Sequence, residues 1–119
     1  MKRILIVEDE TNIAKGLAEL LAMWGYEACG PTQSGDEALR MAYTERPDAV
    51  LMDVRLRGNM DGIEAGRLIN SQLGIPVIIM TAYFSPELER LKETGKIRYL
   101  NKPFELDQLK SSLDECLGD

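Results

Sequence analysis

The side chains that could bind a cation or act on a phosphate each follow a short apolar segment of this 119-residue chain. They are Glu8, Asp9, Asp53, Thr81 and Lys102. If the apolar segments are neighbouring strands of one sheet, these groups converge. Three carboxylates then repel one another more strongly than one lysine can offset. A divalent cation resolves this repulsion, so these residue types indicate a metal site.

Magnesium is the cation that this ligand set favours, because it takes oxygen ligands and keeps several waters when the protein supplies few groups. An aspartate beside such a cation can attack phosphorus as a nucleophile. The cation, the ammonium of Lys102 and the hydroxyl of Thr81 would each hold one equatorial oxygen of the transferred group. The pattern therefore predicts phosphoryl transfer onto an aspartate.

The chain contains no histidine and only two cysteines. The absence of histidine excludes Ser-His-Asp and Cys-His chemistry and disfavours a conventional zinc site. Cys29 and Cys116 lack the close spacing of a metal or redox pair, so we expect buried, reduced thiols. The chemistry must rest on carboxylates, hydroxyls and amines.

Apolar runs alternate with amphipathic stretches, which indicates a β–α unit repeated five times. Strands are expected at residues 4–7, 27–30, 49–52, 76–80 and 97–100. Helices are expected from Ile13 to Trp24, from Ser34 to before Pro47, at 63–72, at 85–95 and from Leu106 to Leu117. The inward positions of the first helix are Ile13, Leu17, Leu20, Leu21 and Trp24, and those of the last are Leu106, Leu109, Leu113 and Leu117. Ser34 and Ser85 are expected to cap the helices that they precede.

Strands joined through helices must pair in parallel with right-handed crossovers. We therefore expect an α/β fold: a doubly wound five-stranded parallel sheet, (βα)5 and flavodoxin-like, with helices on both faces. Residues 1–119 have room for a single domain. In such folds the functional groups gather at the carboxyl ends of the strands, which is where the five polar residues fall.

The net charge of −6 and the sequence pI near 4.7 come with interspersed charges and no basic stripe, so we expect no direct binding to nucleic acid. No apolar run is long enough to cross a membrane, and the amino terminus does not resemble a signal peptide. A cytoplasmic location without membrane contact is expected.

Five motifs in order resemble the receiver domains of two-component response regulators, over essentially the whole chain. They are Glu8-Asp9, Asp53, Met60-Asp61-Gly62, Thr81-Ala82 and Lys102-Pro103-Phe104, each at the end of an expected strand or in the loop after it. The resemblance is to single-domain regulators of the chemotaxis type among others, and five coincident motifs make it specific.

This resemblance implies that Asp53 is the phosphoacceptor and that Thr81 and Lys102 contact the phosphoryl oxygens. It also implies that Glu8, Asp9, the Asp53 carboxylate and the backbone carbonyl of Arg55 hold Mg²⁺, for which Mn²⁺ is expected to substitute, with no other cofactor. The Lys102-Pro103 peptide is expected to be cis. Thr81 and Tyr99 are expected to form the conformational switch.

The resemblance further implies partners. The phosphoryl donor would be a phosphohistidine on a histidine kinase or a histidine phosphotransfer protein, and the switch would control a downstream effector or output domain. The domain would assist its own phosphorylation and dephosphorylation without being an enzyme for a separate substrate. A phosphorylation-dependent homodimer through the fourth helix, fifth strand and fifth helix is left open.

The loop at residues 54–60 departs from the common family pattern, since it is one residue longer and lacks a proline. Arg55 is therefore the least secure of the expected metal ligands. We hypothesise that the bulk of Arg55 and Tyr83 restricts the attacking water and lengthens the lifetime of phosphorylated Asp53.

Three other functions share parts of this pattern. A hydrolase of the haloacid dehalogenase type needs a second aspartate two residues after the first, where this chain has Arg55. A flavodoxin-like cofactor binder needs a glycine- and hydroxyl-rich loop after the first strand, where Glu8-Asp9-Glu10 would repel a phosphate. A degenerate receiver that only binds proteins is disfavoured by the complete set of Asp53, Thr81 and Lys102. Each residue taken alone also has a structural interpretation, such as helix-start acids for Glu8 and Asp9.

Overall fold

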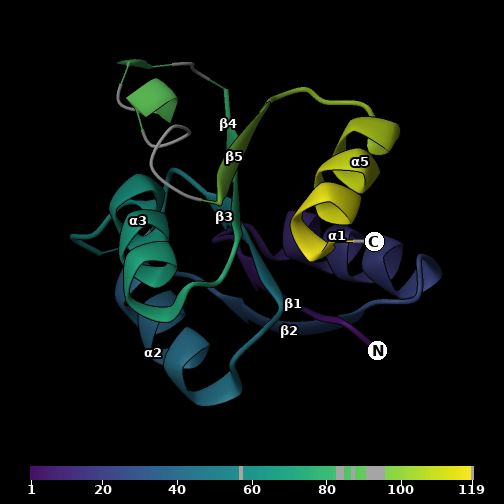
Figure 1. The fold of residues 1–119 in the computed structure, drawn as a ribbon, viewed down its shortest axis with the longest axis horizontal. Coiled ribbons are helices and arrows are strands. Elements are labelled where there is room, and N and C mark those ends of the chain that lie inside the picture. The colour runs from purple at the N-terminus through teal and green to yellow at the C-terminus, as the bar shows by residue number, and fades with distance from the viewer. Residues whose placement is uncertain (57, 83–84, 87, 91–95, 119) are drawn as a thin grey trace.

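The computed structural model describes residues 1–56, 58–82, 85–86, 88–90 and 96–118 and forms a five-stranded parallel sheet (Figure 1). The strand order is β2-β1-β3-β4-β5. The strands are β1 (Arg3–Val7), β2 (Glu27–Thr32), β3 (Ala49–Asp53), β4 (Val77–Thr81) and β5 (Ile97–Asn101). The fold class is thus the doubly wound, flavodoxin-like arrangement that the sequence predicts.

Four helices have bounds within the described residues. They are α1 (Thr11–Met23), α2 (Gly35–Glu45), α3 (Gly62–Leu73) and α5 (Leu106–Leu117). Residues 86 and 88–90 are also helical, where the fourth helix is expected, but its expected end near Gly95 lies outside the described residues. None of the described helices has the length and apolar character needed to cross a bilayer.

The helices cover both faces of the sheet, as expected (Figure 1). Side chains alternate along each strand, so Ile4 and Ile6 of β1 pack in the cluster with α1 and α5, while Leu5 and Val7 pack in the cluster with α2 and α3. Both clusters consist of buried aliphatic side chains. These two apolar layers hold the strands in register and thereby fix what lies at the strand ends.

The expected helix caps are confirmed. The hydroxyl oxygen of Ser34 accepts a hydrogen bond from the Glu37 amide (3.2 Å), and that of Ser85 accepts one from the Leu88 amide (3.3 Å). Asp61 caps α3 in the same way, since its Oδ1 accepts from the Glu64 amide (2.9 Å). Each cap satisfies an amide that the helix itself leaves unpaired.

Three sequence expectations need correction. Strand β2 continues two residues beyond Gly30 to Thr32, through a register shift between Leu5 and Val7 of β1 and a cis Gly30-Pro31 peptide. Ile13 is 43% exposed and Leu106 is 57% exposed, because the buried faces of α1 and α5 are narrower than the leucine-rich pattern indicated.

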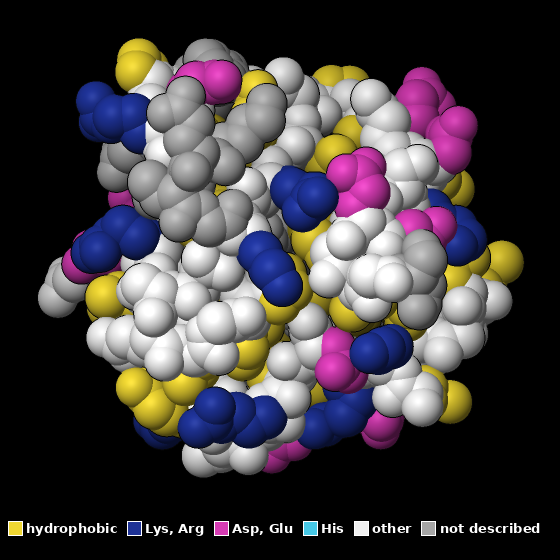
Figure 2. All heavy atoms as spheres, viewed as in Figure 1, with side chains coloured by type: hydrophobic (Ala, Val, Ile, Leu, Met, Phe, Trp, Pro, Cys, Tyr) yellow, Lys and Arg dark blue, Asp and Glu magenta, His cyan; other side chains and the backbone are white. Residues whose placement is uncertain are grey.

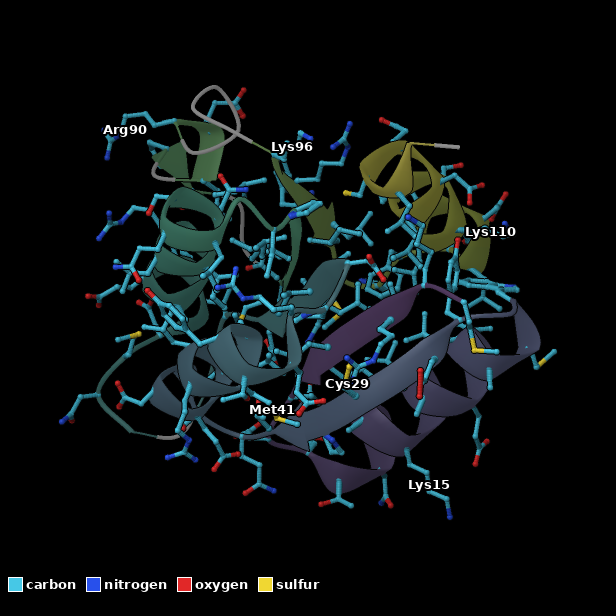
Figure 3. All side chains as sticks on the ribbon, turned by 60° about the horizontal axis from the view of Figure 1, so that its bottom comes forward. Lys15, Cys29, Met41, Arg90, Lys96 and Lys110 are labelled. Carbon is cyan, nitrogen blue, oxygen red and sulfur yellow. The ribbon has the colours of Figure 1, made fainter. Side chains whose placement is uncertain are left out.

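The two cysteines are free, as expected, but only one is fully buried. Cys29 lies on β2 on the side of the sheet that faces α2 (Figure 3), and Cys116 on α5 is half-buried. Burial raises the pKa of both thiols, which keeps them in the protonated, less reactive form.

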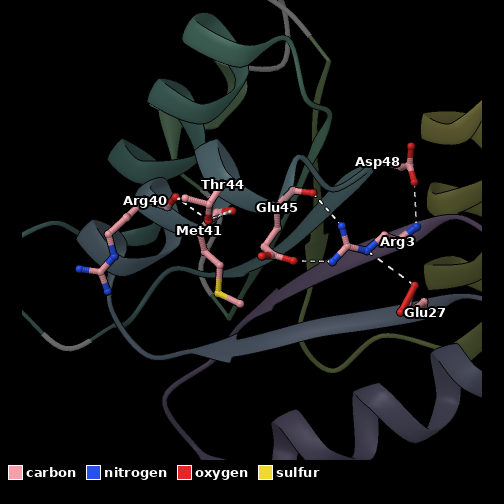
Figure 4. Close-up of polar contacts among 7 residues, drawn as sticks. All are labelled: Arg3, Glu27, Arg40, Met41, Thr44, Glu45 and Asp48. Carbon is pink, nitrogen blue, oxygen red and sulfur yellow. Dashed lines mark hydrogen bonds and ion pairs between the residues drawn. The ribbon is translucent and has the colours of Figure 1, made fainter.

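Arg3 joins three elements at the end of the sheet opposite the candidate site (Figure 4). Its guanidinium donates to the carbonyl of Glu45 (2.7 Å) and to the Glu45 carboxylate (2.6 Å), and it lies 3.6 Å from the Glu27 carboxylate. Its backbone amide donates to the Asp48 carboxylate (2.8 Å). Arg3 thus links β1 to β2, to the end of α2 and to the start of β3.

On the face shown in Figure 2, lysine and arginine side chains lie in several separate groups, with acidic, apolar and uncharged side chains between them. The described residues form no continuous basic stripe on this face of the kind that follows a nucleic-acid backbone.

Replacing Arg46 with glycine is expected to raise the free energy of unfolding. Arg46 follows α2 with φ 47°, and among the described residues it is the one non-glycine residue with a positive φ. Glycine relieves this strain, so we expect Arg46→Gly to gain about 0.5–1 kcal/mol in urea unfolding, despite the loss of the Nε contact to the Tyr43 carbonyl. The same replacement of Arg67, exposed within α3, is expected to lose about 1 kcal/mol. A loss at both positions would contradict the strain argument.

Candidate functional site

Three carboxylates meet where β1 and β3 end. Glu8, Asp9 and Asp53 each place one oxygen within 4.8 Å of the others. Strands β1 and β3 pair in parallel with Val7 beside Met52, so the residues that follow them emerge at the same edge of the sheet. Glu8 is only 2% exposed and Asp53 only 8%. The convergence of these three carboxylates, expected from the sequence, is confirmed.

The amine of Lys102 reaches the same group of acids from β5. Its Nζ lies 3.4 Å from Oδ1 of Asp53, and its backbone amide donates to the carbonyl of Thr81 (2.7 Å). The Lys102-Pro103 peptide is cis, as the family resemblance implies. Thr81 is itself 5% exposed at the end of β4. Three adjacent strands therefore contribute an acid, a hydroxyl and an amine in sequence across the sheet.

The buried position of Glu8 makes its negative charge unfavourable. Burial, and after it the hydrogen bond with Asp53 and the charge of Asp53, together raise the pKa of Glu8 to about 7, against smaller opposing effects of the Glu10 amide and of Lys102. Its Oε1 accepts from the Glu10 amide (3.3 Å), whereas its buried Oε2 has no hydrogen-bond partner among the described residues. An unsatisfied, buried carboxylate oxygen beside two other carboxylates fits a divalent cation.

The backbone around Asp53 is closely packed against the start of α3. The amide of Gly62 donates to the carbonyl of Val54 (2.9 Å), and a Cβ at Gly62 would collide with the carbonyl of Asp53. The amide of Arg55 donates to Oδ1 of Asp53 (3.4 Å). Gly62, which the sequence marks only as part of a motif, is thus required for the close approach of α3 to the acidic residue.

A pocket of about 550 Å³ opens over these groups. Asp9, Asp53, Thr81 and Lys102 line it, so four of the five side chains singled out from the sequence face one cavity. Glu8 instead borders a second, apolar pocket of about 520 Å³ that it shares with Lys102. Arg55, which is expected to supply a metal ligand through its carbonyl and to shield Asp53 through its side chain, also lines the first pocket.

One expected residue is not brought to this pocket. Tyr99 is half-buried on β5, packs against the core that faces α3 and borders a separate groove of about 440 Å³. Tyr83 lies outside the described residues. One residue was missed: Ser85 lines the pocket as well as capping a helix. Its position four residues after Thr81, in the loop beyond a strand end, was the signal that could have revealed it.

Comparison with known proteins matches residues 4–114 to the family described as response regulator receiver domain. The transcriptional regulatory protein PdtaR of Mycobacterium tuberculosis is 39% identical over 114 residues, which cover 95% of this chain and 55% of that protein. The sporulation initiation phosphotransferase F of Bacillus subtilis is 36% identical over 118 residues, which cover 98% of this chain and 94% of that protein. This chain therefore spans about half the length of PdtaR and nearly all of the phosphotransferase.

A solved structure shows the same fold with a metal. The receiver domain of the sensor histidine kinase PA1611 from Pseudomonas aeruginosa, with a magnesium ion coordinated in its active-site cleft, is 33% identical. It matches with a TM-score of 0.82 and covers 99% of this chain and 98% of that one.

The chain belongs to the response regulator receiver domain family. It is a signalling domain of the two-component type rather than a conventional enzyme. Phosphorylation of an aspartate and binding of Mg²⁺ in the active site are general features of this family, and receivers act with kinases and output domains.

Removing the charge of Glu8 is expected to change how stability depends on pH when divalent cations are chelated. Because the pKa of Glu8 is about 7 in the folded state and near 4.5 otherwise, the folded state binds more protons between these values. The free energy of unfolding should therefore fall as pH rises from 5 to about 7. In Glu8→Gln this fall should shrink, leaving the variant more stable at pH 8 by about 1–3 kcal/mol in urea unfolding.

The matched control is Glu19→Gln, an exposed position on α1. Its pH profile should follow the wild type throughout. Parallel profiles for Glu8→Gln and wild type would show that burial of Glu8 does not strain the site.

Proposed function

We propose that Asp53 of this domain receives a phosphoryl group from a phosphohistidine on a histidine kinase or histidine phosphotransfer protein. The observation that carries this proposal is the meeting of Asp53 with Glu8 and Asp9 within 4.8 Å and with the amine of Lys102 at 3.4 Å. Asp53 is the member of the acid cluster in direct contact with Lys102, and it faces the open pocket through which a donor could approach.

Glu8, Asp9, the carboxylate of Asp53 and the backbone carbonyl of Arg55 would hold Mg²⁺, and Mn²⁺ is expected to bind in its place. When bound, the cation supplies positive charge beside the transferred phosphoryl oxygens. The orphaned Oε2 of Glu8 and the raised pKa of this residue both support a cation at this position.

The side chains of the pocket would carry out the transfer itself and stabilise the charge on the phosphoryl oxygens. A carboxylate oxygen of Asp53 forms the bond to phosphorus as the bond to the donor nitrogen breaks, and that nitrogen leaves with its electron pair. Lys102, held beside Asp53, offsets negative charge on the phosphoryl oxygens. The hydroxyl of Thr81 can donate a hydrogen bond to another of these oxygens. The same groups would assist phosphorylation by small donors and dephosphorylation by water.

Phosphorylation adds about −1.5 to −2 charge at the acceptor, which must bias two packings of the domain if it is to act as a switch. We propose that Thr81 and Tyr99 carry this bias toward the surface formed by the fourth helix, β5 and α5. Thr81 lines the pocket, and its carbonyl accepts a hydrogen bond from the backbone amide of Lys102, the residue that follows β5. A change from 1:99 to 99:1 active would need about 5.5 kcal/mol of differential stabilisation.

The partner of this surface would be a downstream effector or an output domain, and a phosphorylation-dependent homodimer is a second use of it. Residues 1–119 would form a single receiver domain located in the cytoplasm, without direct contacts to nucleic acid or membrane. In relatives such as PdtaR the matching region is only about half of the protein.

Replacing the acceptor tests the proposal directly. Treated with a small phosphodonor and Mg²⁺, the wild type is expected to gain the mass of one phosphoryl group in intact-mass spectrometry, and Asp53→Asn is expected to gain none. Asp107→Asn, at an exposed position of α5, should be phosphorylated like the wild type. Phosphorylation of Asp53→Asn to the wild-type extent would place the acceptor elsewhere.

Truncating Arg55 tests the proposed shield. Because Arg55 is exposed and lines the pocket over Asp53, removal of its side chain should admit water more freely. We expect Arg55→Ala to lose its phosphoryl group several-fold faster than wild type, followed by intact mass after removal of the donor. An unchanged rate of loss would rule out shielding by Arg55.

A further inference from the structure

Gly35 is the first residue of α2, and its missing side chain makes room for a loop from another part of the chain. A Cβ at Gly35 would lie 2.8 Å from the carbonyl oxygen of Met60 and 3.0 Å from Cβ and Cγ of Met60. The 2.8 Å separation is shorter than real Cβ contacts, the two of 3.0 Å are very tight, and the nearest neighbour is a backbone atom, which cannot rotate aside. Only glycine allows Met60 to lie this close to α2.

Backbone conformation does not account for glycine at this position. The described glycines with positive φ are Gly25, Gly30, Gly58, Gly74 and Gly118, and Gly35 is not among them. Alanine could therefore adopt the backbone of Gly35, and as a better helix former it would favour α2. The contact with Met60 is what a larger residue would disturb.

The loop that rests on Gly35 is closed on itself beside Asp53. The carbonyl of Val54 accepts the amide of Gly62 (2.9 Å), which brings the two ends of the loop together. Val54, Leu56 and Met60 are partly buried and pack against the core that α2 and α3 share, side by side in Figure 1. Because the ends of the loop are joined and its described apolar side chains are packed, a shift of Met60 is expected to displace the described residues beside Asp53 as well.

Arg55 is one of those residues and is tied to the acid cluster. Its amide donates to Oδ1 of Asp53 (3.4 Å), and its backbone carbonyl is the ligand proposed above to complete the cation site. We propose that Gly35 is a positioning residue for this site. By allowing Met60 to pack closely against α2, it fixes the position of the loop and therefore of the Arg55 carbonyl. This inference rests on the proposed function and adds a residue of a different element to the machinery.

The two alkaline-earth cations respond differently to a displaced ligand. Mg²⁺ demands near-ideal octahedral geometry, whereas Ca²⁺ accepts variable geometry and longer bonds. A misplaced Arg55 carbonyl should therefore weaken binding of Mg²⁺ far more than binding of Ca²⁺. General destabilisation of the fold would weaken both alike, so the ratio of the two affinities separates positioning from a structural role.

The test is isothermal titration of the folded domain with MgCl₂ and with CaCl₂. Gly35→Ala is expected to raise the dissociation constant for Mg²⁺ about tenfold and that for Ca²⁺ by less than about threefold. Gly16→Ala is the matched control, since a Cβ at Gly16 on α1 meets no atom within 4 Å, and both affinities should stay at the wild-type value. If Gly35→Ala does not fold, Met60→Ala is tested in its place, because it removes side-chain atoms that contact α2 and leaves Gly35 unchanged. For this variant we expect a smaller loss of affinity that is still selective for Mg²⁺.

Wild-type affinities for both cations in the folded variant would overturn the inference, as would an equal loss of both. In either case the proposed function stands, provided that the wild type binds Mg²⁺ and Asp53 is phosphorylated. Failure of the wild type itself to bind Mg²⁺ would overturn both the cation site and the positioning role of Gly35.

Discussion

The mutual repulsion of three carboxylates at one edge of a parallel sheet is the constraint around which this domain is built. Glu8 and Asp53 are almost inaccessible to solvent, and the single positive charge of Lys102, whose amine contacts Asp53, cannot neutralise three carboxylates. Burial first, and then the neighbouring Asp53, raise the pKa of Glu8, which shows that its negative charge is unfavourable here. Stability and cation binding are therefore linked, because any cation that binds the folded acids but not the unfolded chain stabilises the fold.

The sheet holds these groups together despite their repulsion. These groups come from the ends of four strands: Glu8 and Asp9 follow β1, Asp53 ends β3, Thr81 ends β4 and Lys102 follows β5. Their separations are set by strand register, which two apolar layers enforce from opposite faces. The carbonyl of Thr81 and the amide of Lys102 are joined directly, so the ends of β4 and β5 cannot move independently.

Near the carboxylates, two glycines allow close packing because they have no Cβ atom. Gly62 lets the start of α3 approach the carbonyl of Asp53, and Gly35 lets the start of α2 approach Met60. The intervening loop is thus held between two helices and the strand that carries the candidate acceptor. The position of Arg55 thus depends on the packing of the loop backbone as well as on its own hydrogen bond to Asp53. Through Gly35, α2 helps to set that position, although none of its residues lines the pocket.

The sequence alone determined the strand–helix alternation, the helix caps at Ser34 and Ser85 and the convergence of Glu8, Asp53, Thr81 and Lys102. Such features follow from local periodicity, cap chemistry and the rule that parallel strands end together. Only the tertiary structure decided that Ile13 and Leu106 are exposed, that β2 continues past Gly30 through a register shift, that Ser85 lines the pocket and that Gly35 carries Met60. Each of these features depends on contacts between segments that are distant in the chain. A local sequence pattern does not specify which distant segment will pack beside a given residue.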